Sequence, residues 1–136
     1  RTQIPAVLAF IGTVSEKYGL RIGNIFHAGD GNLHPLILFD IRDKDQLTRV
    51  HGASREILEY CIRVGGSITG EHGVGVEKRD IMPLLFTNDD LDIMASLRKA
   101  FNPQLLLNPQ KVIPAPHLCQ EVFGPAQHEV LTKEGF

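Results

Sequence analysis

The sequence predicts an α+β fold in which helices flank an antiparallel pair of strands. Three observations predict it. Apolar residues recur at helical spacing in several segments, two extended runs are separated by a turn-rich stretch, and the order along the chain is helix, two strands and further helices. With 136 residues the chain has room for one modest domain with an apolar core.

The first helix is predicted over residues 4–18, where apolar side chains recur at helical spacing and Gly19 provides a stop signal. Extended runs follow at 20–27 and 34–40. Pro35 is compatible with a strand only near the strand's start or on a sheet edge. Both faces of the second run are apolar, so we expect each side of the sheet to be covered.

A second long helix is predicted over residues 44–64, and a short one over 76–86. A further helix should end at Phe101, with Asn88 or Asp89 as its N-cap and an Asn-Pro pair as its break. Acidic residues in its first turn and basic residues in its last suit the helix dipole. The remaining tail shows little periodicity and is expected to be irregular.

Composition narrows the functional classes. The net charge is -2 and the basic residues are scattered, which argues against a nucleic-acid partner. No apolar run approaches the ~20 residues that a membrane-spanning helix needs. Cys61 lies in the apolar stripe of the second long helix and is interpreted as a buried thiol. With only Cys119 besides it and no secretory signal, a reducing compartment, and so a cytoplasmic location, is expected.

Two histidines flank the turn-rich stretch. If the extended runs form a hairpin around a six-residue loop, His27 and His34 become direct cross-strand neighbours on one face, roughly 4.5–5.5 Å apart at Cβ. That spacing suits two ligands of one divalent metal. The alternative is a pair of structural histidines bonded to loop carbonyls. Gly29 and Gly31 favour a ligand, because glycine permits a close backbone approach, although the loop's Asp and Asn are also ordinary turn formers.

A second cluster lies in the glycine-rich segment 65–75, where a carboxylate and an imidazole are adjacent. Glu71 could complete a two-His-one-carboxylate set with the two hairpin histidines, leaving open positions for a substrate. His72 would then be free to act as a base, since its unperturbed pKa lies near neutrality. Two alternatives stay open: a backbone contact to a phosphate or flavin, and a plain flexible loop.

The motifs together resemble one family. Residues 27–35 (HAGDGNLHP), 65–75 (GGSITGEHGVG), 100–103 (AFNP) and 107–114 (LNPQKVIP) resemble the FAD-linked oxidase carboxy-terminal domain. Within it, the chain is most similar to the flavin subunits of bacterial glycolate oxidases and to D-lactate dehydrogenases. The chain begins with Arg1 rather than Met, so we expect a fragment that is inactive when isolated.

The resemblance implies a vanillyl-alcohol-oxidase-type flavoprotein. Residues 1–101 would form part of its substrate or cap domain, including part of an antiparallel sheet, and 102–136 a segment returning to the flavin domain plus a tail. The implied cofactors are FAD, held mostly by a missing N-terminal domain, and a divalent metal such as Zn, Mn or Fe. The implied residues are the metal ligands His27, His34 and Glu71, the catalytic base His72, Asn32 near the flavin, and Asn108 and Lys111 on the returning segment.

The implied activity is oxidation of glycolate or a small D-2-hydroxy acid, such as D-lactate, to the 2-oxo acid. Leu36 stands where relatives acting on dicarboxylic acids carry Asn, which favours a small monocarboxylate. The implied partners are the N-terminal FAD domain, electron-accepting subunits and a second copy in a homodimer. Such subunits would place the protein in the cytoplasm or peripherally at the inner membrane. The alternative is a non-catalytic metal-binding or interaction module.

Overall fold

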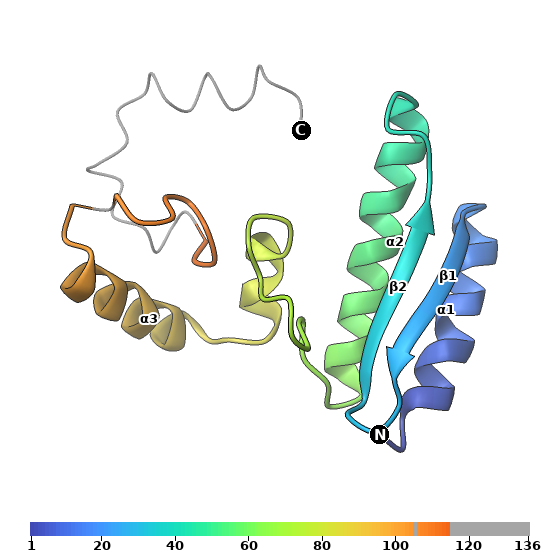
Figure 1. The fold of residues 1–136 in the computed structure, drawn as a ribbon, viewed down its shortest axis with the longest axis horizontal. Helices are drawn as coiled ribbons and strands as arrows, with labels where there is room; N and C mark the ends of the chain where they lie inside the picture. The colour runs from blue at the N-terminus through green and yellow to red at the C-terminus, as the bar shows by residue number, and fades with distance from the viewer. Residues whose placement is uncertain (105, 115–136) are drawn as a thin grey trace. The chain divides into compact units, whose positions relative to one another are not determined.

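The computed structural model describes residues 1–104 and 106–114, and confirms an α+β fold with a small antiparallel sheet (Figure 1). The chain divides into two compact units, Arg1–Gly73 and the part from Val74 onward. The expected domain boundary at residue 101 concerns the complete protein and stays a prediction. Cys119 lies outside the described residues.

The first unit is a helix, a hairpin and a second helix: α1 (Ile4–Tyr18), β1 (Arg21–His27), β2 (Asn32–Leu38) and α2 (Lys44–Arg63). These bounds agree closely with the predicted segments, although β2 begins and ends two residues earlier than the predicted run 34–40. α1 ends at Gly19, whose φ of 60° is left-handed, as the stop signal predicts. No helix in the described part of the chain is long and apolar enough to cross a bilayer.

The core of this unit lies between the two helices and one face of the hairpin. The buried side chains of this core are apolar and come from α1, α2 and the residue before β1: Val7, Ile11, Val14, Leu20, Ala53 and Ile57. Ile22, Leu33 and Ile37 pack against them from the hairpin. Cys61 packs there too, half-buried rather than fully buried, and burial raises the pKa of its thiol.

The opposite face of the hairpin carries exposed apolar side chains. Ile25, Leu36 and Leu38 are 59%, 48% and 59% exposed. Within Arg1–Gly73, α1 and α2 cover the other face, as expected. A cover for the face with Ile25, Leu36 and Leu38 stays a prediction for the complete protein.

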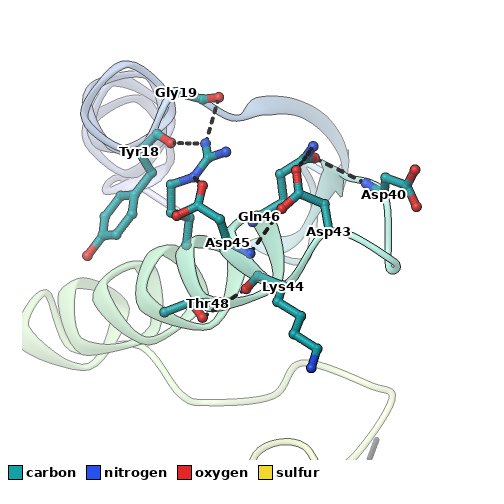
Figure 2. Close-up of polar contacts among 9 residues, drawn as sticks. Tyr18, Gly19, Asp40, Asp43, Lys44, Asp45, Gln46 and Thr48 are labelled. Atoms are coloured by element: carbon teal, nitrogen blue, oxygen red, sulfur yellow. Dashed lines mark hydrogen bonds and ion pairs between the residues drawn. The ribbon is translucent and has the colours of Figure 1, made fainter.

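Polar contacts tie α2 to the end of α1 (Figure 2). Asp43 caps α2, since its carboxylate accepts hydrogen bonds from the backbone N–H groups of Asp45 and Gln46. From the first turns of α2, Arg49 donates to the carbonyl oxygens of Tyr18 and Gly19 at 2.7 and 3.2 Å. These bonds satisfy carbonyls that the end of α1 leaves without helical partners.

The second unit begins with η1 (Arg79–Leu84), a 3-10 helix that lies within the predicted short helix, and continues with α3 (Asn88–Phe101). The predicted N-cap of α3 was wrong, because Thr87 caps the helix instead of Asn88 or Asp89. Thr87 accepts a bond from the Asp90 N–H, and the Asp90 carboxylate accepts one from the Thr87 N–H. This reciprocal capping box places Asn88 and Asp89 inside the first turn.

Candidate functional site

The hairpin turn brings two imidazoles to one face of the sheet. β1 ends at His27, whose carbonyl oxygen accepts bonds from the N–H groups of Asp30 and Gly31, both at 3.0 Å. Gly31 has a φ of 82°, a left-handed conformation that glycine adopts without strain. The His27 and His34 rings lie edge to face, with centroids 5.3 Å apart. Their side chains point away from the α1–α2 core.

The predicted register of the hairpin was wrong by two residues. His27 pairs with Asn32, and His34 pairs with Ile25, so the two histidines are diagonal neighbours rather than direct partners. The turn is shorter than assumed because Asn32 already belongs to β2. Side chains alternate between the faces with a period of two, so a shift by two residues keeps both imidazoles on the same face. The proximity of the rings survives the error in register.

The glycine-rich segment after α2 brings Glu71 to these histidines. The Gly66 N–H bonds to the Cys61 carbonyl at 2.8 Å, and Ile68, only 2% exposed, anchors the segment. The Glu71 Oε1 atom lies 3.2 Å from His34 Nε2 and 3.8 Å from His27 Nε2. Three residues from separate stretches of sequence therefore meet at one carboxylate oxygen.

This group has the dimensions of a metal site. His27, His34 and Glu71 each offer one ligand atom, and these atoms all lie within 4.8 Å of one another. Ligands bound to one cation at about 2.0–2.2 Å lie roughly 3.0–3.5 Å apart, so small side-chain movements would accommodate an ion. Two imidazole nitrogens and a carboxylate oxygen suit Zn, Fe or Mn. Half of the His27 and Glu71 side chains is exposed, which leaves room for a further ligand.

His72 lies beside this group. Its Nε2 atom is 3.4 Å from Glu71 Oε1, and its ring centroid is 4.9 Å from that of His34. The side chain is 73% exposed, so it is open to a molecule bound next to the three ligand atoms. An imidazole in this position can accept a proton from such a molecule.

Asn32 also reaches the site. Its Nδ2 atom lies 3.4 Å from His34 Nε2, and its side chain fills the space where Gly70 would carry a Cβ. Sequence reasoning associated Asn32 with a flavin and missed this contact. The sequence contains no signal for it, since Asn32 and Gly70 are separated by the whole of α2.

Asn108 and Lys111 lie in the second unit, on the segment that follows α3. Arg98 holds the backbone of this segment by donating to the carbonyl oxygens of Leu107, Asn108 and Lys111. The backbone N–H of Val112 also bonds to the Gly75 carbonyl at 2.8 Å. The segment is thus tied to α3, and the roles of Asn108 and Lys111 toward a flavin stay predictions.

Residues 1–112 match the family described as FAD linked oxidases, C-terminal domain. The chain is 48% identical over 124 residues to the glycolate oxidase subunit GlcD of Escherichia coli, which covers 91% of the chain and 25% of that protein. It is 43% identical over 112 residues to GlcD of Bacillus subtilis, covering 82% and 24%. It is 32% identical over 102 residues to a D-lactate dehydrogenase of Archaeoglobus fulgidus, covering 74% and 22%. The chain spans about a quarter of the length of these curated relatives.

Proposed function

The chain belongs to the family of FAD linked oxidases, C-terminal domain, and we propose that it forms the substrate-site part of a flavin-dependent 2-hydroxy-acid dehydrogenase. The reaction is oxidation of glycolate or a small D-2-hydroxy acid, such as D-lactate, to the 2-oxo acid. The observation that carries the proposal is the meeting of His27, His34 and Glu71 within 4.8 Å. It occurs in a chain similar to proteins named glycolate oxidase subunit and D-lactate dehydrogenase.

In this proposal, His27, His34 and Glu71 hold a divalent cation beside the substrate. When bound, the cation would lower the pKa of the substrate hydroxyl, and FAD would accept the hydride from the α-carbon. About half of the His27 and Glu71 side chains is exposed, so the substrate's hydroxyl and carboxylate oxygens would approach the cation from there. Support for this arrangement comes from the donor set, since two imidazoles and one carboxylate leave coordination positions free.

His72 would accept the hydroxyl proton at an imidazole nitrogen. Support comes from its place next to the Glu71 carboxylate, 3.4 Å away, and from the exposure of 73% of its side chain. Removal of the proton as the hydride leaves avoids a build-up of positive charge on the substrate oxygen. The chain's own residues thus bind and orient the acid and move one proton.

The remaining parts of the proposal concern the complete protein. It would be a vanillyl-alcohol-oxidase-type flavoprotein in which this chain supplies part of the cap domain, and Asn32, Asn108 and Lys111 lie toward the FAD. Partner subunits would accept the electrons and could hold the protein at the inner face of a membrane. Support comes from the likeness to proteins named as subunits of glycolate oxidase.

The test uses the complete protein under anaerobic conditions. Glycolate and D-lactate should bleach the oxidised flavin, and D-2-hydroxyglutarate should do so less well, because Leu36 offers no polar group to a second carboxylate. Glu71→Gln should reduce both Zn²⁺ binding and bleaching. The exposed Glu16 provides a matched control, since Glu16→Gln makes the same chemical change on α1.

The competing candidate is a metal-binding module without redox activity, which the same ligand set would also serve. Zn²⁺ binding by a protein whose flavin none of these acids reduces would favour that candidate. A protein that binds no divalent metal, yet oxidises the acids normally, would instead remove the metal from the mechanism.

A further inference from the structure

The Asn32 side chain joins the hairpin to the glycine-rich segment. On one side its Nδ2 atom lies 3.4 Å from His34 Nε2. On the other side a Cβ placed on Gly70 would lie 2.6 Å from Asn32 Cγ and 3.1 Å from Asn32 Nδ2. Real Cβ atoms do not approach other carbon atoms so closely, so Asn32 fits only because residue 70 has no side chain.

Gly70 and its neighbouring glycines are required for different reasons. Gly65, Gly73 and Gly75 have positive φ values, so their conformation favours glycine. Gly70 is not among the residues with positive φ, and its backbone would accept alanine. What excludes a side chain at residue 70 is the space that Asn32 occupies.

Asn32 also does not behave as an ordinary turn former. The N–H groups of the hairpin turn bond to the His27 carbonyl, not to the Asn32 side chain. Within the described residues, this side chain makes its polar contact with His34, from Asn32 Nδ2 to His34 Nε2. The amide is therefore turned toward the site rather than used to close the turn.

We propose that Asn32 is a positioning residue, which packs against Gly70 and thereby sets the distance from the Glu71 carboxylate to the hairpin imidazoles. Glu71 directly follows Gly70, so displacement of that backbone moves the carboxylate. Asn32 is paired with His27 and lies two residues before His34 on the same face. One side chain thus links all three groups. Zn²⁺ binding as a readout of this role rests on the proposed function, whereas the packing of Asn32 on Gly70 does not.

The experiment is a double-mutant cycle in the complete protein with Gly70→Ala, Asn32→Ala and both together. Zn²⁺ affinity is measured by isothermal titration calorimetry, and thermal unfolding is followed in parallel. Each single variant should lose about 10–100-fold in Zn²⁺ affinity, the usual effect of removing a group that orients a ligand. In the Asn32→Ala background, Gly70→Ala should have no further effect, because the space is then free. The control is Gly12→Ala, since a Cβ on Gly12 meets nothing within 4 Å.

The outcomes separate this inference from the proposed function. Additive effects of the two substitutions on both affinity and unfolding temperature would overturn the positioning role. If the unaltered protein binds no Zn²⁺, the metal site fails, and non-additive unfolding temperatures still decide whether Asn32 and Gly70 are coupled. If Gly70→Ala alone does not fold, the double variant should fold, and its failure to do so would also overturn the inference.

Discussion

Around Glu71, one carboxylate oxygen lies within 3.8 Å of three imidazole nitrogens, from His27, His34 and His72. Of the three, His34 is the least exposed, with 18% of its side chain accessible, whereas His72 is 73% exposed. The difference in exposure suits different roles at the residue scale. The largely enclosed His34 imidazole is held in place, whereas the exposed His72 imidazole can meet a substrate.

The first prediction concerns His72. In the complete protein, His72→Ala should lower turnover by about 10²–10⁴-fold, because general-base catalysis contributes that much, and should leave bound FAD and Zn²⁺ affinity unchanged. Steady-state rates with a dye acceptor and the flavin absorbance of the purified protein measure these quantities. His51→Ala is the matched control, since His51 is exposed on α2. Unchanged turnover in His72→Ala would contradict the proposed role of His72 as the general base.

At the scale of the elements, two helices depend on specific contacts at particular residues. α1 and α2 approach each other at Gly52, where a Cβ would lie 2.8 Å from Cε1 of the Tyr18 ring. α3 depends on its capping box, in which Thr87 and Asp90 satisfy each other's backbone N–H groups. Each contact leads to a prediction about stability.

Gly52→Ala should destabilise the fold, although alanine favours a helix more than glycine does. The added methyl group meets a rigid aromatic ring, and overpacking of this kind typically costs about 1–3 kcal/mol. Gly12→Ala on α1 has open space and should be neutral or slightly stabilising. Thermal unfolding followed by circular dichroism compares the two variants. Equal unfolding temperatures for both would contradict the close packing of α1 on α2.

Thr87→Ala should destabilise α3 by about 0.5–2 kcal/mol, the usual effect of losing an N-cap, and Thr87→Ser should restore most of the loss. The Thr87 hydroxyl and backbone N–H hold the pKa of Asp90 below its ordinary value. The stabilising contribution of the Asp90 carboxylate is therefore present above its unfolded pKa and lost as the pH falls through the lower, folded pKa. Unfolding curves over acidic pH should show a weaker pH dependence in Thr87→Ala than in the unaltered protein.

At the scale of the whole molecule, the chain spans about a quarter of the length of its relatives. One face of its hairpin carries exposed apolar side chains. Ile25 and Leu36 lie on the same face as His34. Apolar surface next to a polar site is commonly covered by another part of the protein or by a ligand. We therefore expect further residues of the complete protein to cover this face.

Residues 1–136 alone should bind no FAD and oxidise no 2-hydroxy acid, whereas the complete protein should do both. The physical reason is that, in the proposed function, parts of the complete protein outside these residues hold most of the flavin. Flavin absorbance after desalting, and dye reduction with glycolate, measure the two properties. Stoichiometric FAD bound to residues 1–136 would contradict the proposal that other parts of the complete protein hold most of the flavin.

The sequence by itself determined the elements and the chemistry available at the site. Local patterns decide these features, since α1 and α2 follow from apolar spacing of 3.6 residues and from stop signals such as Gly19. Residue types alone indicated that His27, His34 and Glu71 are suitable ligands. The N-cap of α3 was mispredicted because Thr87, Asn88 and Asp89 are all good caps, and only the backbone conformation selects one.

Only the tertiary structure decided the register of the hairpin and the partners of the glycine-rich segment. The turn closes at Asn32, two residues earlier than assumed, and strand pairing depends on such closure rather than on the alternation within each strand. The contact of Asn32 with Gly70 arises because α2 folds back over the hairpin and returns the chain to its turn. Contacts between residues distant in sequence depend on this packing, and local sequence patterns do not predict it.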